Sequence, residues 1–327
     1  MGSFITNLGL LINATLIATP PLLLAALGSC FSERISERFF RVKFRGLSNP
    51  YGVLFNPASI AKAIERIADK RMVTERELHR GSEGWFHYDM HSSLSRSSSE
   101  QCVEAINAAT LSANEALSRA NHLIITFVTA IVYERKEYLS VVANCHKQPQ
   151  REFHSRVLST DEIVAMWREI IRSRLHDKSI ILTLSPVRHI ADSAELNSLS
   201  KATLRCAIAK LCEEFDNICY FPSYEIMMDD LRDYRFYDED LVHPSKLAVD
   251  YIWERFSAAA LTPRTREILP EIEAVIAAAE HRPLHPESEA HSKFMAKYAA
   301  IAEQLQLREK ISFEREIAHF RQKALSK

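Results

Sequence analysis

Four short apolar runs, separated by segments with helical periodicity, constrain the fold of this chain more than any other feature. The runs are LLLAALG (residues 22–28), HLIITFVTAIVY (122–133), SIILTLSP (179–186) and ICYFP (218–222). Strands that are apolar along their whole length are typical of parallel sheets buried on both faces. The alternation of strand and helix along the chain therefore predicts an α/β domain whose parallel sheet is covered by helices on both sides.

The helical segments carry recognisable start signals. Asn56 precedes Pro57, which are the residue types of an N-cap and a first helical position. Ser159 and Glu162 have the spacing of a capping box. A stripe of apolar residues at helical spacing follows the first run: Phe31, Ile35, Phe39 and Val42. Further helices are predicted over residues 198–215 and 245–257.

Other segments are predicted to be irregular or to lie outside the sheet. The stretch NPYGVLFNP (49–57) is interpreted as turn, short strand and turn, and residues 85–100 as irregular surface chain. The composition changes after Pro263, and a stripe at helical spacing follows: Phe294, Tyr298, Ile301 and Leu305. We therefore predict an α/β domain over 1–262 and a helical extension over 263–327, which packs on the core or forms a homo-oligomer.

Charge and cysteine content exclude some classes of protein. The 41 basic and 42 acidic residues give a net charge of −1, which excludes a general nucleic-acid footprint. The six cysteines are scattered through a long chain, which favours reduced thiols in the cytoplasm. All seven glycines lie at or before position 84, so a glycine-built oxyanion loop is expected only in the first quarter of the chain.

The sequence around Leu27-Gly28-Ser29-Cys30 allows a second interpretation. Residues 1–32 carry no charged side chain, and this corner has the small residues of a lipoprotein cleavage site. A secretory leader needs a positive N-terminal region, which is absent, and Pro20-Pro21 interrupts the run too early for a membrane span. A cytoplasmic protein without membrane attachment is favoured, and a lipid-anchored exported protein is the alternative.

Two segments suggest nucleophilic chemistry at the carboxyl ends of the strands. Cys30 opens a helix directly after the first run, where the helix dipole would lower the pKa of the thiol; alternatively, it is a small buried residue. Asp240 and His243 are three residues apart on a connection, so the carboxylate could orient the imidazole as a base. A surface loop is the alternative interpretation of that pair.

Weaker candidates surround these two segments. Gly52 could donate its N–H to an oxyanion or simply form a turn, and Asn144 with His146 could contact substrate or stabilise a loop. Arg232 or Arg235 could meet an anionic substrate or lie on a solvated face. Three alternating residues could share one face, but loop polarity is favoured over a metal site there: His87, Asp89 and His91.

Several motifs together resemble the GSCFA-domain family, which is grouped with the SGNH (GDSL-like) hydrolases. They are LGSCF, NPYGVLFNP, WFHYDMHSSLS, VVANCHKQPQREF, LTLSPVRH, YFPSYEIMMDDLRDYRFYDEDLVHPS and HRPLHPESEA. The resemblance extends almost from end to end and implies a three-layer α/β/α domain.

The resemblance also implies roles for individual residues. It places Cys30, rather than Ser29, at the nucleophile position, and it matches Asp240 and His243 to the closing D-x-x-H block. Gly52 matches the oxyanion glycine of the second block. Arg188 and His189, in the LTLSPVRH motif, are predicted to contact substrate.

One block departs from the family pattern. GSCFA proteins typically have T-L-G-T-A-W where this chain has TFVTAI (126–131), so Val128 replaces a glycine and Ile131 a tryptophan. A branched side chain at 128 could crowd the pocket or block a backbone donor. The resemblance therefore implies a hydrolase or O-acyltransferase acting on a small-molecule or carbohydrate ester without metal or cofactor, and the alternative is an inactive binding protein.

Overall fold

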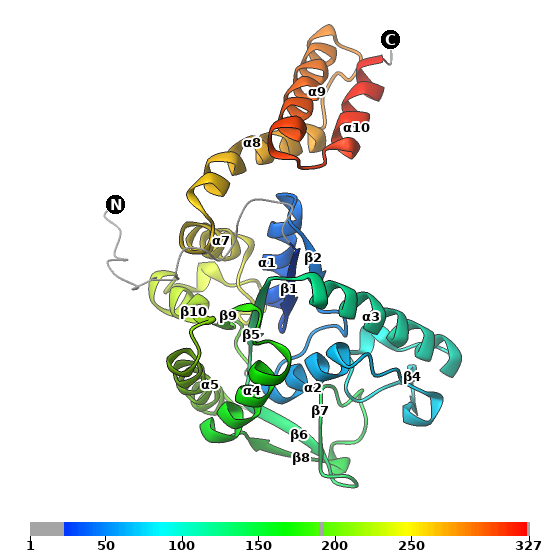
Figure 1. The fold of residues 1–327 in the computed structure, drawn as a ribbon, viewed down its shortest axis with the longest axis vertical. Helices are drawn as coiled ribbons and strands as arrows, with labels where there is room; N and C mark the ends of the chain where they lie inside the picture. Colours follow the sequence, from blue (N-terminus) through cyan, green and yellow to red (C-terminus); the bar gives the residue numbers. More distant parts are fainter. Residues whose placement is uncertain (1–22, 190–192, 326–327) are drawn as a thin grey trace.

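The computed structural model describes residues 23–189 and 193–325, and its centre is a parallel sheet (Figure 1). Within that part of the chain, the sheet has five strands in the order β10-β9-β5-β1-β2. Their bounds are β1 Leu23–Leu27, β2 Arg45–Ser48, β5 His122–Phe127, β9 Ser179–Leu184 and β10 Ile218–Phe221. Every pairing between neighbours is parallel. The carboxyl ends of all these strands therefore lie at one edge of the sheet.

Helices cover both faces of the sheet. Along β1, Ala26 packs into one hydrophobic cluster and Leu27 into the other, because successive side chains of a strand point to opposite faces. The first face is covered by α1 (Cys30–Arg41) and α7 (Lys246–Ala260). The opposite face is covered by α2 Pro57–Ala68, α3 Ser99–Arg119, α4 Thr160–Arg174 and α5 Ala194–Glu214. The predicted three-layer α/β/α architecture is confirmed.

The predicted helix starts are also confirmed. Asn56 caps α2, and its side chain accepts a hydrogen bond from the N–H of Ser59 at 2.8 Å. Ser159 and Glu162 form the capping box of α4, in which each side chain bonds the other residue's backbone N–H. These local contacts satisfy backbone donors that the first helical turn leaves unpaired.

The second apolar run is not a single strand. It is divided between β5 and β6 (Ile131–Arg135), and β6 belongs to an antiparallel sheet with β7 (Ser140–Val142) and β8 (Phe153–Val157). The chain turns between them because the N–H groups of Val128 and Thr129 both donate to the carbonyl oxygen of Phe55, at 3.0 and 3.1 Å.

Two further predictions of local structure need correction. Residues 85–100 are irregular surface chain only in part, because 85–86 belong to β4 (Gly84–Phe86), which forms a hairpin with β3 (His79–Gly81), and Phe86, Tyr88 and Met90 are buried. No strand lies within NPYGVLFNP (49–57), and the nearest one, β2, ends at Ser48. Shorter elements connect these parts: η1 Glu75–Glu77, η2 Ser92–Leu94, η3 Gln150–Glu152, α6 Ser223–Glu225, η4 Ile226–Asp230 and η5 Tyr234–Phe236.

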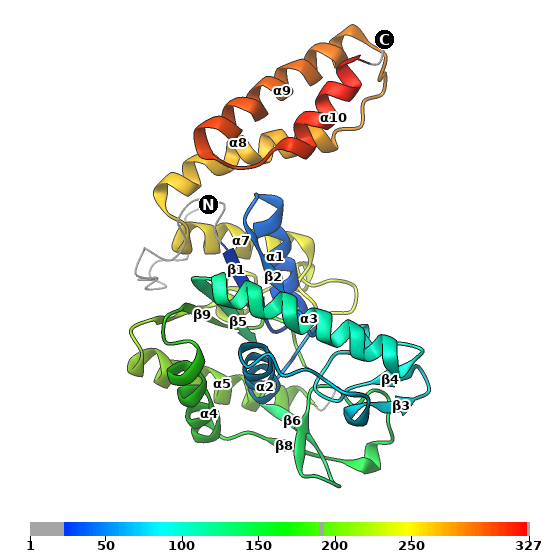
Figure 2. The same cartoon turned by 45° about the vertical axis from the view of Figure 1, so that its right-hand side comes forward.

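The last three helices form an arm that projects from the α/β body beside α7 (Figures 1 and 2). They are α8 Pro263–Glu280, α9 Glu289–Glu309 and α10 Glu314–Leu325. The hydrophobic cluster on the α1 face of the sheet continues through α7 into this arm. Among the described residues, no helix has both the length and the apolar character needed to cross a bilayer.

Candidate functional site

The corner between β1 and α1 is tightly built around Gly28. This residue has φ +137°, and a Cβ atom there would lie 2.2 Å from the carbonyl oxygen of Thr126 on the neighbouring strand β5. Glycine is therefore required for β1 and β5 to approach each other at the point where α1 begins. The next two residues, Ser29 and Cys30, are held at this edge of the sheet.

Ser29 and Cys30 differ in accessibility. Ser29 is fully buried and caps α1, with its hydroxyl oxygen accepting the N–H of Ser32 at 3.3 Å. Cys30 is the first residue of the helix and is partly exposed. Of the two, Cys30 presents the more accessible nucleophilic atom.

The prediction of a lowered pKa at Cys30 is wrong. Burial raises the pKa of the thiol, and this effect outweighs the opposing effects of the Phe31 N–H and the Arg34 guanidinium. The resting side chain at neutral pH is therefore a thiol rather than a thiolate. Any reaction at this sulfur requires a base that removes its proton.

The lipid-anchor interpretation places a cleavage site just before Cys30. A cut there would remove β1, which lies between β2 and β5 in the sheet. Attachment of lipid to Cys30 would therefore require a sheet without β1. The leader of this alternative interpretation falls largely on residues 1–22, outside the described residues.

Asp240 and His243 are hydrogen bonded to each other on the loop before α7. One carboxylate oxygen lies 2.6 Å from Nδ1 of His243, and the other accepts the N–H groups of Val242 and His243, both at 2.9 Å. The backbone N–H of His243, together with these further bonds, holds the pKa of the Asp240 carboxyl far below its usual range. An anionic Asp240 favours a proton on Nδ1, which leaves Nε2 of His243 able to accept one.

Arg34 connects the helix of Cys30 to the loop of His243. It lies one helical turn after Cys30, and its guanidinium donates to the carbonyl oxygen of Pro244 at 2.7 Å and to Asp238 at 2.9 Å. Asp238 in turn donates its N–H to the carbonyl oxygen of His243 at 2.7 Å. The two candidate segments are therefore joined by charge-assisted bonds between residues more than 200 positions apart.

The N–H of Gly52 is already engaged. It donates to the carbonyl oxygen of Asn49 at 2.8 Å, so it could serve an oxyanion only after this turn opened. A Cβ atom at position 52, where φ is +76°, would lie 2.3 Å from Cβ of His91. Gly52 is therefore required for close packing against the 87–91 segment.

Asn49 has a larger part in the site than the sequence suggested. Its side-chain oxygen accepts the N–H of Gly28 at 2.8 Å, and its amide nitrogen donates to Glu33 at 3.1 Å. The N–H of Val128 is also engaged, by Phe55 at 3.0 Å, and the side chain of Val128 is buried. Neither Gly52 nor Val128 offers a free backbone donor at this edge.

His146 contacts the 87–91 segment directly, and Asn144 holds His146 in place. Nε2 of His146 is 3.0 Å from the carbonyl oxygens of both His87 and Met90, and its ring stacks on Phe86 at 4.1 Å. Asn144 accepts the N–H of His146 at 2.7 Å. Burial lowers the pKa of His146 to about 4, so the ring is neutral at physiological pH. Both side chains are occupied in stabilising this segment.

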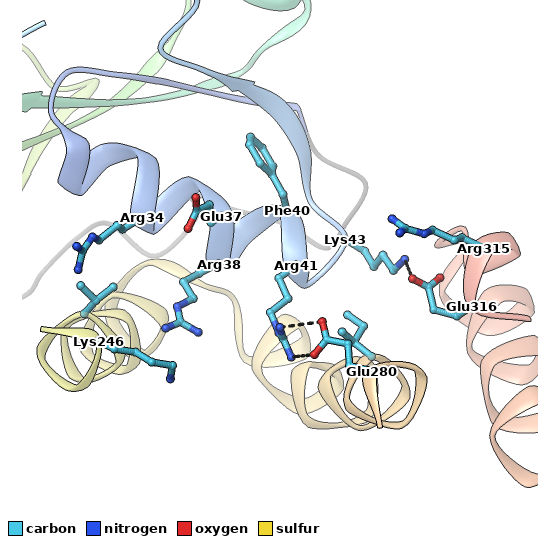
Figure 3. Close-up of a pocket in the computed structure, with 12 residues that line it drawn as sticks. Arg34, Glu37, Arg38, Phe40, Arg41, Lys43, Lys246, Glu280, Arg315 and Glu316 are labelled. Carbon is cyan, nitrogen blue, oxygen red and sulfur yellow. Dashed lines mark hydrogen bonds and ion pairs between the residues drawn. The ribbon is translucent and has the colours of Figure 1, made fainter. Parts of the chain in front are cut away.

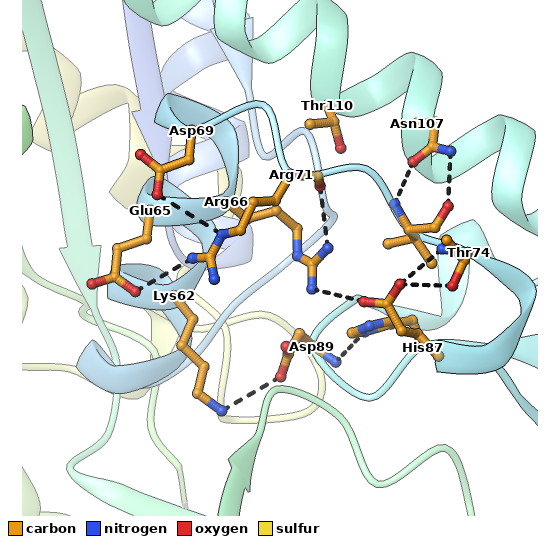
Figure 4. Close-up of polar contacts among 12 residues, drawn as sticks. Lys62, Glu65, Arg66, Asp69, Arg71, Thr74, His87, Asp89, Asn107 and Thr110 are labelled. Carbon is orange, nitrogen blue, oxygen red and sulfur yellow. Dashed lines mark hydrogen bonds and ion pairs between the residues drawn. The ribbon is translucent and has the colours of Figure 1, made fainter.

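A polar network ties the same segment to α2 (Figure 4). Lys62 of α2 lies 3.6 Å from Asp89, and the N–H of Asp89 donates to Nδ1 of His87 at 3.1 Å. The ring of His91 pairs locally with Ser93. Among the described residues, no three histidine, cysteine, aspartate or glutamate side chains are grouped so that they could hold a metal ion.

Arg188 and His189 follow β9 and border the His243 loop. The N–H of Arg188 donates to the carbonyl oxygen of Val242 at 3.2 Å, and its guanidinium lies 4.2 Å from the ring centroid of Tyr237. The N–H of His189 donates to Asn197 at 2.9 Å. The structure thus brings Arg188 to the segment that carries Asp240 and His243.

A cleft lies away from this edge, between α1 and the arm. This cleft has a volume of about 710 Å³ and is lined mainly by charged side chains (Figure 3). Arg41 of α1 binds Glu280 of α8 through two bonds of 3.0 and 2.6 Å, and Lys43 binds Glu316 of α10 at 2.7 Å. These ion pairs connect the arm to the helix that begins at Cys30.

The fold and this edge define an α/β/α protein with a cysteine at the first strand–helix corner and an Asp–His pair on a loop joined to the same helix. The chain belongs to the GSCFA family, whose model matches residues 23–256. A second model, the C-terminal domain of GSCFA domain proteins, matches residues 272–325. No curated protein matches the sequence.

Proposed function

We infer that the protein is an SGNH-like hydrolase or O-acyltransferase that acts on a small-molecule or carbohydrate ester in the cytoplasm. Cys30 is the nucleophile, His243 the base and then the acid, and Asp240 the residue that orients His243. The observation that carries the inference is the pair of hydrogen bonds made by the Arg34 guanidinium. They join the helix of Cys30 to the loop of the Asp240–His243 pair. Each of the six cysteines is free of a disulfide, in keeping with a reducing compartment.

The proposed reaction has two steps. First, His243 takes the proton of the Cys30 thiol while sulfur bonds to the ester carbonyl carbon; the carbon–oxygen bond then breaks and the leaving alcohol receives that proton. Second, His243 removes a proton from water or an acceptor hydroxyl, whose oxygen attacks the thioester and releases the Cys30 sulfur. The N–H of Cys30 lies at the helix start and supports the oxyanion, and Gly52 would do so if its turn opened.

Turnover of 4-nitrophenyl acetate by single variants tests this assignment. We expect Cys30→Ala to abolish turnover. We also expect it to abolish the acetyl thioester, which is detected as an increase in the mass of the intact protein, because both require the Cys30 sulfur. We expect Ser29→Ala to keep turnover while costing about 1 kcal/mol of stability through loss of the helix cap. Cys206→Ala is the matched control, since Cys206 is an exposed thiol outside the site. Full activity of the Cys30 variant contradicts the proposal.

A binding protein without catalysis is the second candidate. Two observations favour it. The N–H groups of Gly52 and Val128 already donate to carbonyl oxygens and are not available to an oxyanion, and the pKa of the Cys30 thiol is raised. The same experiment separates the two candidates. Wild-type protein that forms no thioester and shows no turnover beyond that of its Cys30→Ala variant would be a binding protein.

A further inference from the structure

A small cavity beside the His243 loop is lined by two arginines and two tyrosines. Its volume is about 130 Å³, the space of roughly four water molecules, which suits one small polar group better than a sugar ring. Its lining comes from the loop after β9, from η4 and from the segment that follows η4: Arg188, Met227, Met228, Leu231, Arg232, Asp233, Tyr234 and Tyr237. It adjoins the candidate site through the bond between the Arg188 N–H and Val242.

Within the described part of the chain, the two arginines of this cavity have no carboxylate partner. Arg188 is half-buried and Arg232 is exposed. Asp233 also lines the cavity, but both of its carboxylate oxygens are bound by Arg235, at 2.9 Å from the backbone N–H and 3.0 Å from the guanidinium. A partly desolvated guanidinium without an anion is costly unless a ligand supplies one.

Tyr237 gives a second indication of a ligand. It is 8% exposed, and Arg188 is the donor beside its hydroxyl, which has no partner of good geometry within the described part of the chain. Its ring lies beneath the Arg188 guanidinium, whose centre is 4.2 Å from the ring centroid. Stacking fixes the guanidinium plane and leaves its N–H donors at the edge, where they could bind oxygen atoms.

We propose that this cavity binds an anionic oxygen group, a carboxylate or a phosphate, of the molecule that reacts at Cys30. Arg188 and Arg232 neutralise the group and the Tyr237 hydroxyl donates to it. The substrate is therefore an ester or acyl compound that carries a negative charge away from the reacting carbonyl. This inference rests on the proposed acyl chemistry only for the identity of the substrate, because binding of the anion does not require Cys30.

Binding is tested first, without any reaction. Succinate and inorganic phosphate are titrated separately, at ionic strength matched with NaCl, while the melting temperature is followed. We expect one or both anions to raise the wild-type Tm by roughly 2–4 °C, and the responding anion identifies the chemical source. Arg232→Ala and Tyr237→Phe should abolish the rise, and Arg119→Ala, which removes an exposed arginine of α3 that pairs with Glu115, should keep it. No rise in wild type, or an equal rise in all variants, overturns the proposal.

Selectivity is tested next with esters that share one leaving group. 4-Nitrophenyl acetate is compared with the mono-4-nitrophenyl esters of succinate, glutarate and adipate, which differ in the distance from carbonyl to carboxylate. We expect kcat/KM for the best anionic ester to exceed that for acetate by about tenfold or more, and Arg232→Ala to remove this preference. Turnover of acetate without any anionic preference overturns the inference and leaves the proposed function standing. Anion-dependent stabilisation without turnover of any ester supports the inference and contradicts the proposed function.

Discussion

Lys201 is a fully buried cation on α5 that the proposed reaction does not use. Its ammonium group donates to the carbonyl oxygen of Ser185, the residue after β9, at 2.8 Å. Burial lowers the pKa of Lys201 from 10.5 to about 7, because a charge inside the protein loses its hydration without gaining a carboxylate partner. The folded protein therefore holds this proton less tightly than the unfolded chain does.

This difference predicts the sign of a pH effect on stability. Between about pH 7 and pH 10.5 the unfolded chain binds a proton at Lys201 that the folded protein lacks, so the free energy of unfolding should rise with pH. The contribution of this one group is at most roughly 1.4 kcal/mol per pH unit. Urea unfolding of wild type and Lys201→Met at pH 7, 8 and 9 measures this contribution. The Met variant, which has no charge to bury, should have the larger free energy of unfolding at pH 7, and its advantage over wild type should shrink as pH rises.

A surface lysine provides the control for Lys201. Lys136 is exposed, so Lys136→Met should follow the wild-type pH dependence. If the stability difference between wild type and Lys201→Met is the same at every pH, Lys201 does not titrate in this window.

Residue-scale prediction from the sequence succeeded where partners are close in the chain. The caps at Asn56 and Ser159 follow from residues three positions apart, and the Asp240–His243 pair likewise. Asn49 and Arg34 were not predicted, since their partners are 16 to 210 positions away. The raised pKa of Cys30 was missed for a related reason. The helix start can be recognised from nearby residues, whereas the burial that raises the pKa depends on elements far away in the sequence.

At the scale of elements, α1 and the loop before α7 behave as one unit through Arg34. Its two bonds, to Pro244 and Asp238, fix the loop that carries His243 relative to the helix start at Cys30. Arg34 is a positioning residue, since it acts on the site through this loop. Lysine could not reproduce its effect, because an ammonium group lacks the planar pair of donors.

We expect Arg34→Ala to lower kcat for ester turnover by about tenfold or more, with a smaller change in KM, because misplacement of a base slows the proton transfer. Arg34→Lys should recover only part of the loss. Arg41→Ala, on the same helix but paired with Glu280 in solvent, is the control and should stay within about twofold of wild type. Equal kinetic effects of the Arg34 and Arg41 variants would refute the positioning role.

Element boundaries show what apolar patterning cannot predict. The run over 122–133 is buried as far as residue 132, so its composition gives no sign that β5 ends at Phe127 and that β6 starts a second sheet. The division depends on Phe55, a residue of another loop, which binds the two N–H groups at the turn. Similarly, the aromatic residues near 86–90 are buried only because β7 and β8 form a surface against which they pack.

At the scale of the whole molecule, the arm is attached to the body by apolar packing and by ion pairs to α1. Cations on α1 and just after it each bind a different element. Arg34 binds the His243 loop, Arg38 binds Asp250 of α7, Arg41 binds Glu280 of α8, and Lys43, two residues past the end of α1, binds Glu316 of α10. Lys43 also lies 5.2 Å from the ring centroid of Phe313, which is buried in the arm. These cations therefore join the segment that starts at Cys30 to the His243 loop and to α7, α8 and α10.

These ion pairs differ in burial, and that difference predicts their strength. The side chains of Arg41 and Glu280 are 42% and 56% exposed, whereas those of Lys43 and Glu316 are 19% and 12% exposed. Water screens the first pair, so its coupling energy should be about 0.2–1 kcal/mol. Removing Lys43 leaves the Glu316 carboxylate poorly solvated, with one oxygen already lacking a partner among the described residues. Lys43→Ala should therefore cost about 1–3 kcal/mol.

Double-mutant cycles with alanine at both pairs, followed by urea unfolding, measure the two coupling energies. We expect the Lys43–Glu316 coupling to exceed the Arg41–Glu280 coupling and to persist in 1 M NaCl, whereas the exposed pair should lose most of its coupling there.

Unfolding followed separately by near-UV and far-UV signals shows whether the arm and the body unfold together. If the arm is held to α1 through Lys43, the Lys43→Ala variant should separate the two transitions while Arg41→Ala should not. Coincident transitions and equal couplings at the two pairs would mean that the apolar core alone joins the arm to the body.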